Sequence, residues 1–339
     1  MPMPFPKRDI VAVCSGFTGI TRLLGLLPTR PALLVLNYHR IGNPEDCPYD
    51  SEVFSATTDE FDDQIRFLAR QFHLAPLEEA IEIIESAKRP RGTAVLLTFD
   101  DGYLDHYETA FPHLSARKAP AVFFLPTAFI GTNRIAWWDA IAFIIKHSRK
   151  TAFQVNSPSV ESFDIAREGV ERVIKRVLWM CKLASVQDPE SFIATLEEAC
   201  DSPRPGPSER CFLSWDEAAS MVRGGMAIGS HTHSHETLSR LSEERQLDEL
   251  VTSKRELEER LGIPVHTISY PVGRLESFSS VTRAAAVKAG YRVAFSFYGG
   301  CNPFGAIDPY DVRRYAPNAR APRFRLQTTL AAVTSKYWL

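Results

Sequence analysis

Thr98-Phe99-Asp100-Asp101-Gly102-Tyr103 is the most informative stretch of this 339-residue chain. It follows a continuous apolar run, residues 94–97, which predicts a buried strand. Two adjacent carboxylates at the end of such a strand are costly to desolvate unless a cation or a hydrogen-bond network receives them. Because neighbouring side chains of an extended segment point in different directions, Asp100 and Asp101 can face one cavity from different angles and do different jobs. The alternative interpretation is an ordinary exit from strand to loop that carries two solvated acids.

Strands and helices alternate on both sides of this stretch. Apolar runs predict further strands at residues 32–37, 121–125, 227–230, 267–270, 292–297 and 312–315. Strands that alternate with helices at this interval favour parallel strands in an α/β architecture, either a barrel or an open sheet. From about residue 139 to residue 211 the alternation stops, and helical patterns follow one another at 140–146, 165–183 and 190–199. We interpret this part as a helical insertion between two strands.

The composition is that of a soluble globular protein, with 45% apolar residues, 24% charged residues and a formal net charge of -2. There is no basic surplus, so the composition gives no support to a nucleic-acid partner. The six cysteines are scattered without a Cys-x-x-Cys spacing, and a chain of this size needs no disulfides to be stable. We therefore expect free thiols. A disulfide between Cys200 and Cys211, which flank a proline-rich loop, is the alternative if the compartment is oxidising.

The N-terminal segment, residues 1–30, needs a separate interpretation. Lys7 and Arg8 precede an apolar stretch from Ile10 to Ile20, which resembles a signal peptide only faintly because no clear cleavage site follows it. Arg22 interrupts the apolar run, which is also too short for a transmembrane helix. We therefore predict a helical docking segment with a peripheral membrane contact, and a cytoplasmic or membrane-peripheral location.

Three histidines within five residues, His231-Thr232-His233-Ser234-His235, follow the predicted strand at 227–230. Imidazole is the commonest transition-metal ligand near neutral pH, and residues four apart fall on one face if the backbone turns helically. Two such imidazoles with one carboxylate give three protein ligands and an open position, the form of a hydrolytic zinc site. There is no His-Glu-x-x-His helix, so a zincin protease is not supported. A histidine-rich loop without metal is the alternative.

These two stretches together resemble the first two motifs of the polysaccharide deacetylases, the NodB-homology fold of the family-four carbohydrate esterases. Ser269-Tyr270-Pro271-Val272-Gly273 is similar to the Tyr-Pro-x-Gly form of the third motif. The resemblance covers roughly residues 30–135 and 212–318. It implies an α/β fold, a deformed (β/α) barrel, in a catalytic domain at 31–339 with the helical insertion at about 139–211.

The resemblance also implies roles for individual residues. Asp101, His231 and His235 would bind a divalent metal, usually zinc in this family, with Ni2+, Co2+, Fe2+ or Mn2+ as alternatives. Asp100 would be the general base, and the backbone amide of Val272 would be an oxyanion donor. This division of labour makes physical sense, because the metal neutralises one carboxylate while the other stays free to accept a proton.

Two departures from the family pattern bear on catalysis. The usual third motif begins with an arginine that orients the base, and here Ser269 occupies that place. Arg313 or Arg314, near the last predicted strand, could substitute, and we assign Arg314. The general acid is commonly a late histidine, but no histidine follows His266. Members similar to the poly-N-acetylglucosamine deacetylases take it from an early Tyr-His, so the resemblance points to His39 as the general acid.

The predicted activity is hydrolysis of an N-acetyl group on an amino sugar, with an N-acetylated oligo- or polysaccharide as the substrate. Two alternatives stay open, an O-deacetylase or an amidase for a non-sugar C–N bond on the same scaffold, and a non-catalytic glycan-binding or assembly protein. Adjacent tryptophans could form a sugar-stacking platform or a hydrophobic clasp for the next helix. The candidate substrate contacts are Tyr103, Trp137, Trp138, Tyr270 and Pro271.

Overall fold

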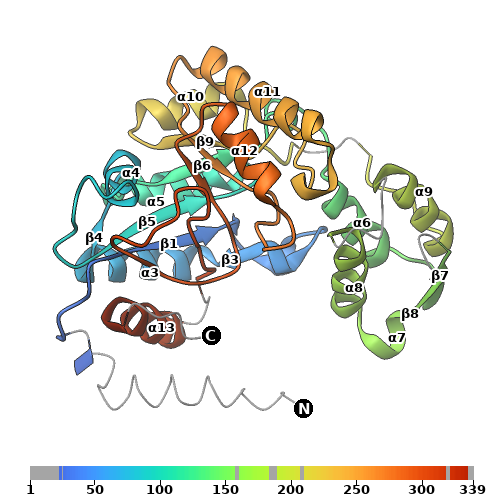
Figure 1. Cartoon of the computed structure of the whole chain (residues 1–339). Helices are drawn as coiled ribbons and strands as arrows, with labels where there is room; N and C mark the ends of the chain where they lie inside the picture. Colours follow the sequence, from blue (N-terminus) through green and yellow to red (C-terminus); the bar gives the residue numbers. More distant parts are fainter. Residues whose placement is uncertain are drawn as a thin grey trace. The chain divides into compact units, whose positions relative to one another are not determined.

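The computed structural model describes residues 23–24, 26–156, 160–182, 189–206, 210–317 and 321–334 (Figure 1). Most of the predicted docking segment at 1–30 therefore lies outside the described residues. Within the described part, no helix is long and apolar enough to cross a membrane. The chain divides into two compact units, which are described separately. Unit 1 comprises Met1–Gly42, Phe54–Ile130 and Leu213–Leu339, and unit 2 comprises Asn43–Val53 and Gly131–Phe212.

Unit 1 is built on a curled sheet with the strand order β11-β10-β9-β6-β5-β1-β12, in which β4 also pairs with β5 (Figure 1). All pairs of strands in it are parallel except β1 with β12. A parallel sheet with helices between its strands confirms the predicted α/β class. The strands are β1 (Ala32–Tyr38), β4 (His73–Leu74), β5 (Thr93–Phe99), β6 (Val122–Leu125), β9 (Ala227–Ser230), β10 (Thr267–Ser269), β11 (Val293–Phe295) and β12 (Asn302–Pro303).

The continuous apolar runs form the centre of this sheet. Every residue of β1 and β5 is buried, as expected for strands covered on both faces. The strand predicted at 312–315 is not formed, because this segment makes only two isolated bridges, Leu36 with Tyr315 and Phe295 with Val312. A separate short parallel pair joins β2 (Arg40–Ile41) to β3 (Phe54–Ala56).

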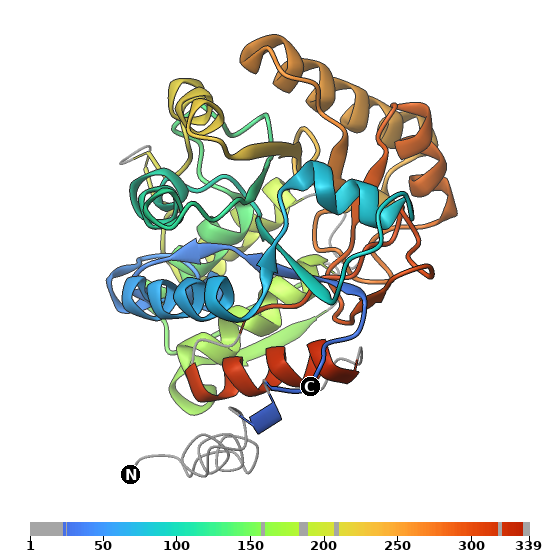
Figure 2. The ribbon, with the colours of Figure 1, turned by 90° about the vertical axis from the view of Figure 1, so that its left-hand side faces the viewer.

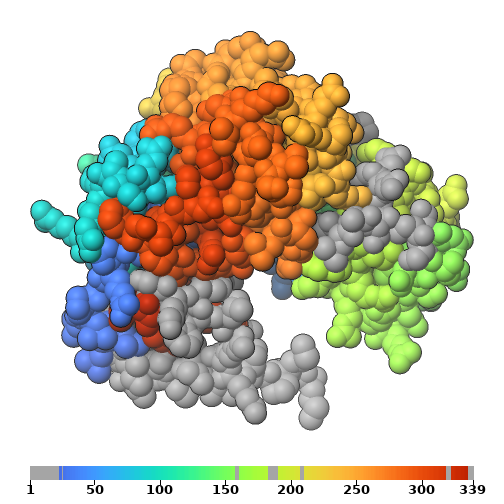
Figure 3. Space-filling model, in the orientation of Figure 1, coloured from blue at the N-terminus to red at the C-terminus, as the bar shows by residue number. Residues whose placement is uncertain are grey.

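Helices cover the sheet of unit 1. The helices α11 and α12 pack against each other, and their residues, coloured orange, lie on the face drawn in Figure 3. The helix α13, drawn in red in Figure 2, packs beside α3. Arg325 of α13 forms an ion pair with Asp63 of α3. The helical elements are α3 (Thr58–Gln71), α4 (Leu77–Ile84), the π-helical turn η3 (His106–Ala110), α5 (Phe111–Ala116), α10 (Trp215–Arg223), η4 (Leu238–Arg240), α11 (Glu243–Leu261), α12 (Ser280–Lys288) and α13 (Ala321–Thr334).

Unit 2 is mainly helical, and it also contains an antiparallel hairpin that the sequence patterns do not predict. The helix expected at 165–183 is broken at Gly169, whose φ of 89° is incompatible with a continuous right-handed helix. The elements are η1 (Pro44–Asp46), η2 (Ser51–Val53), α6 (Trp137–Lys146), β7 (Ala152–Val155), β8 (Glu161–Asp164), α7 (Ile165–Glu168), α8 (Val170–Lys182) and α9 (Pro189–Cys200).

Candidate active site

The predicted catalytic side chains follow the carboxyl ends of neighbouring strands in unit 1. The register pairs Tyr38 at the end of β1 with Phe99 at the end of β5. It also pairs Ser230 at the end of β9 with Ile268 in β10. Because parallel strands present their carboxyl ends at one edge, residues far apart in the sequence meet there.

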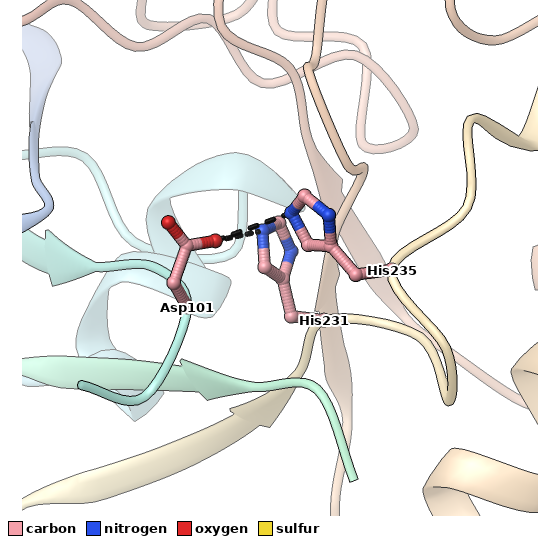
Figure 4. A group of neighbouring side chains, drawn as sticks. All are labelled: Asp101, His231 and His235. Carbon is pink, nitrogen blue, oxygen red and sulfur yellow. Dashed lines mark ion pairs between the residues drawn. The ribbon is translucent and has the colours of Figure 1, made fainter. Parts of the chain in front are cut away.

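Asp101, His231 and His235 converge at this edge (Figure 4). The Oδ1 atom of Asp101 lies 3.3 Å from Nε2 of His231 and 3.2 Å from Nε2 of His235. One ligand atom from each residue lies within 4.8 Å of the other two. Burial alone would raise the pKa of Asp101, but its hydrogen bonds with the two imidazoles hold that pKa well below its usual range.

The hydrogen bonding of His231 shows that this cluster fits a cation. Nδ1 of His231 lies 2.8 Å from the carbonyl oxygen of Ser269, which can only accept, so Nδ1 carries the proton. In the neutral imidazole, Nε2 then presents a lone pair to the carboxylate oxygen of Asp101. Two facing acceptors need a proton or a cation between them. Two imidazoles and a carboxylate are also a donor set that divalent zinc prefers.

Asp100 is held by Arg314. The guanidinium donates two hydrogen bonds to the carboxylate, from Nη1 to Oδ1 at 2.9 Å and from Nη2 to Oδ2 at 2.8 Å. Arg314 is fully buried, and its Nε donates to the carbonyl of Ser296 at 2.9 Å. This two-point contact fixes the plane of the carboxylate and neutralises its charge in the core.

Asn37 and Ser269 complete the network around this pair. Asn37 donates from Nδ2 to Oδ2 of Asp100 at 3.0 Å and accepts at Oδ1 from Nη1 of Arg314 at 2.8 Å. The hydroxyl of Ser269 lies 3.2 Å from Oδ2 of Asp100 and 2.6 Å from Nη2 of Arg314. Burial alone would raise the pKa of Asp100, but the charge and hydrogen bonds of Arg314 hold it well below its usual range. Asp100 is therefore ionised near neutral pH.

The structure distinguishes the two arginines that the sequence leaves as alternatives. Arg313 is exposed, whereas the neighbouring Arg314 points into the core and contacts Asp100. Asn37 is a member of the network that sequence reasoning missed. Its signal is weak, a single amide at the end of an apolar run. The register of β1 against β5 places Asn37 opposite Thr98, two residues before its hydrogen-bond partner Asp100.

His39 directly follows the last residue of β1. Its backbone N–H donates to Oγ of Ser55 at 2.9 Å, and its carbonyl oxygen lies 2.8 Å from Nε2 of His106. Burial lowers the pKa of His39, and the charges of Asp101 and Asp100 offset this only in part. The imidazole is therefore within electrostatic reach of both carboxylates.

Strained backbone is concentrated at this site. Among the described non-glycine residues, Asp101, Thr232, His235 and Val272 all have positive φ, between 59° and 76°. For a β-branched residue such as Val272 this conformation is a true outlier, which costs about 1–3 kcal/mol. A neighbouring hydrogen bond, from the N–H of Phe297 to the carbonyl of Gly273 at 2.6 Å, holds this loop. The surrounding structure thus holds the backbone of Val272 in this strained conformation.

Two tyrosines predicted as substrate contacts are packed in the core of unit 1. Tyr103 is fully buried, and the guanidinium of Arg40 lies 4.7 Å from the centre of its ring. Tyr270 is 1% exposed and stacks on Phe278 with ring centres 4.7 Å apart. Pro271 is also buried. A side chain without exposed surface cannot stack on a sugar, so this burial argues against the three contacts.

The two tryptophans begin α6 in unit 2. Their rings meet edge to face with centres 5.4 Å apart. Trp138 is 5% exposed, which favours a packing role for it, whereas Trp137 is only partly buried. Trp137 is therefore the one of the pair that keeps surface for a ligand.

A family model described as polysaccharide deacetylase matches residues 87–294. The chain belongs to the polysaccharide deacetylase family. Members of this family are hydrolases that act on carbon–nitrogen bonds, and they generally use a divalent metal. A curated relative, YxkH of Bacillus subtilis (strain 168), is 23% identical over 267 residues, which cover 78% of this chain and 64% of the relative. The chain thus spans less than two thirds of that relative's length.

Three solved structures have the same fold as this chain. IcaB from Ammonifex degensii superposes with a TM-score of 0.57 at 20% identity, over 90% of this chain and 99% of that one. The deacetylase PplD of Streptococcus pyogenes superposes with a TM-score of 0.56 at 18% identity, over 89% of this chain and 99% of that one. The polysaccharide deacetylase BC0361 of Bacillus cereus superposes with a TM-score of 0.54 at 16% identity, over 88% of this chain and 69% of that one. These likenesses confirm the predicted deformed (β/α) barrel.

Proposed function

We propose that this member of the polysaccharide deacetylase family is a metal-dependent hydrolase that removes the N-acetyl group from an amino sugar in a glycan or glycoconjugate. One observation carries the proposal. Two adjacent carboxylates occupy separate environments, since Asp101 faces two imidazoles and Asp100 is held by a buried arginine. A protein that only binds a metal needs no second carboxylate held by a buried arginine. A metal-dependent hydrolase needs both a cation site and an oriented base.

Asp101, His231 and His235 would hold the metal, with zinc as the best match to the donor set. A divalent cation held there supplies Lewis-acid activation of the acetyl carbonyl and of the attacking water. Asp100 accepts the proton of that water while its other contacts keep the carboxylate plane fixed. Because Asp100 is ionised near neutral pH, it is always ready to accept this proton.

The remaining groups act on the substrate's acetamide. The backbone amide of Val272 donates to the oxygen that gains negative charge as water adds to the carbonyl carbon. His39 gives a proton to the nitrogen as the C–N bond breaks, which yields acetate and a free amine. Burial lowers the pKa of His39, which makes its protonated form a better donor. Arg314 does not touch the substrate and orients Asp100.

Acetate release tests this function directly. We expect the full-length protein loaded with zinc to release acetate from N-acetylglucosamine oligomers, to lose this activity after treatment with a chelator, and to regain it when zinc is returned. Matched O-acetylated sugars and non-sugar acetamides serve as control substrates. If acetate were released only from these control substrates, the proposed N-acetylated sugar would be wrong as the substrate. A protein that binds no metal would contradict the proposed chemistry.

Trp137 provides a test of sugar binding. If its ring stacks on the substrate, Trp137→Ala should raise KM about two- to tenfold with little change in kcat, because one stacking contact contributes about 0.5–1.5 kcal/mol. Trp179, 40% exposed on the surface of α8, is the matched control, and Trp179→Ala should leave KM unchanged. Equal KM values in wild type and Trp137→Ala would exclude the contact.

A further inference from the structure

The loop that carries the two histidines of the candidate metal centre is held from outside by a buried carboxylate. Glu249 lies on the inner face of α11 and is 7% exposed. Its Oε2 accepts hydrogen bonds from two successive backbone amides, those of His233 at 2.9 Å and Ser234 at 2.8 Å. Its Oε1 accepts from the hydroxyl of Ser234 at 2.6 Å. Three donors thus converge on one side chain.

The held amides lie between His231 and His235 in the chain, at the centre of the loop. The backbone on either side is strained, with φ of 64° at Thr232 and 59° at His235. Each such residue costs about 1–3 kcal/mol and persists only where neighbouring contacts impose it. Hydrogen bonds from backbone amides to a charged carboxylate are among the stronger ones in proteins, particularly away from water.

The other side of this loop is tied to the chain after β6. The N–H of Ala128 donates to the carbonyl of His233 at 2.9 Å, and Oγ1 of Thr127 lies 2.8 Å from Nδ1 of His233. The middle residue of the loop is thus fixed through its amide, its carbonyl and its ring. The ring of His233 is turned to Thr127, while the two flanking imidazoles face Asp101.

We propose that Glu249 is a positioning residue for the metal centre, which sets the separation and orientation of the imidazoles of His231 and His235 through the loop backbone. The inference rests on the proposed function, because it assumes that these imidazoles bind a metal. Glu249 would act through its hydrogen bonds to the loop backbone and to the Ser234 hydroxyl, and not as a metal ligand. Its removal should allow the strained loop to relax, so that the two ligands no longer meet a cation together.

Direct titration of the metal-stripped full-length protein with Co2+ tests this role without an activity assay. We expect Glu249→Ala to raise the Kd for Co2+ about tenfold, the lower end of the range for residues that support metal ligands. Its Co2+ absorption spectrum should differ from that of wild type, because the ligand geometry changes. Glu249→Gln should bind within about threefold of wild type, since one amide oxygen can still accept from both backbone N–H groups.

Gln246 is the matched control on the same helix. It is 3% exposed, donates to the carbonyl of Leu241 at 3.0 Å and accepts from Thr282 at 2.7 Å, but it does not touch the histidine loop. Gln246→Ala should lower the Tm of the metal-stripped protein as Glu249→Ala does, yet leave the Kd and spectrum of Co2+ unchanged. If Glu249→Ala does not fold, Glu249→Asp is used in its place. The aspartate side chain is one methylene shorter, so its carboxylate is too far from the loop to accept the same hydrogen bonds.

The outcomes separate this inference from the proposed function. Wild-type affinity and an unchanged spectrum in Glu249→Ala would overturn the positioning role alone. Equal losses of affinity in Glu249→Ala and Gln246→Ala would also overturn it, since they would reflect only general destabilisation. A wild-type protein that binds no Co2+ would overturn the proposed function, and this inference with it.

Discussion

Asp100→Asn should lower the rate of acetate release by a factor of about 10²–10⁴ while the protein still binds its metal. Asparagine has the shape of aspartate but cannot accept a proton at working pH. Its amide group would also place a donor against a donor of Arg314 where the carboxylate now accepts two hydrogen bonds. The rate is measured as acetate released from N-acetylglucosamine oligomers, and the metal content is measured after dialysis.

The neighbouring residue provides the control. Asp101→Asn should lose the metal together with the activity, because Asp101 faces both imidazoles. The two adjacent variants therefore separate loss of the base from loss of the cation. An Asp100→Asn protein that kept full metal and more than about a tenth of the wild-type rate would remove Asp100 from the role of base.

Arg314→Met should destabilise the metal-stripped protein by about 3–5 kcal/mol at neutral pH, the usual cost of removing one partner from a buried ion pair. The guanidinium is fully buried and Asp100 is 2% exposed, so water cannot replace the lost contact. The free energy of unfolding is measured by urea denaturation. Arg314→Lys should lower the free energy of unfolding less than Arg314→Met, because lysine keeps the positive charge. It should still be less stable than wild type, because lysine cannot make the two-point contact with the carboxylate.

The pH dependence of this loss has a definite sign. In wild type the folded-state pKa of Asp100 lies below the unfolded value, so its contribution is complete above the unfolded value and is lost as the pH falls. Without Arg314, burial raises the folded-state pKa instead, and the variant loses stability as the pH rises. The difference between the two proteins should therefore already be present near pH 4, grow towards pH 7 as the variant loses stability, and shrink only as the pH falls below the unfolded-state pKa.

Arg313 is the matched control for this second prediction. Its side chain is exposed, so Arg313→Met should change the free energy of unfolding by no more than about 0.5 kcal/mol at either pH. A loss in Arg314→Met that did not depend on pH would show that packing, and not the charge of Asp100, dominates its effect.

Local patterns predict the strands and the loops that carry the ligands. The strands β5 and β9 can be predicted because each apolar run ends abruptly in acidic or histidine residues. The end of each strand can therefore be predicted from the local sequence alone. The choice between Arg313 and Arg314 needs tertiary structure. Adjacent residues of an extended segment face opposite ways, and sequence alone does not say which of the two faces is the core.

Burial and tertiary packing account for features that local sequence patterns do not reveal. Tyr103 and Tyr270 stand beside motif residues, but their aromatic rings bury large apolar areas and pack inward. In unit 2 the hairpin of β7 and β8 is too short for its alternation to be recognised, although Phe153 and Phe163 stack across it with ring centres 5.0 Å apart. The helix α13 was not predicted, and tertiary packing beside α3 supports it.

The network around Asp100 also constrains the order in which the chain can fold. Arg314 follows Asp100 by 214 residues, so a growing polypeptide presents the carboxylate long before the guanidinium that neutralises it has been synthesised. Until then, closing the centre of the sheet would desolvate an unpaired charge. We expect the early strands to stay loosely associated with Asp100 hydrated, and the final compaction to wait for the segment around Arg314. Such late, long-range closure is typical of slowly folding proteins of high contact order.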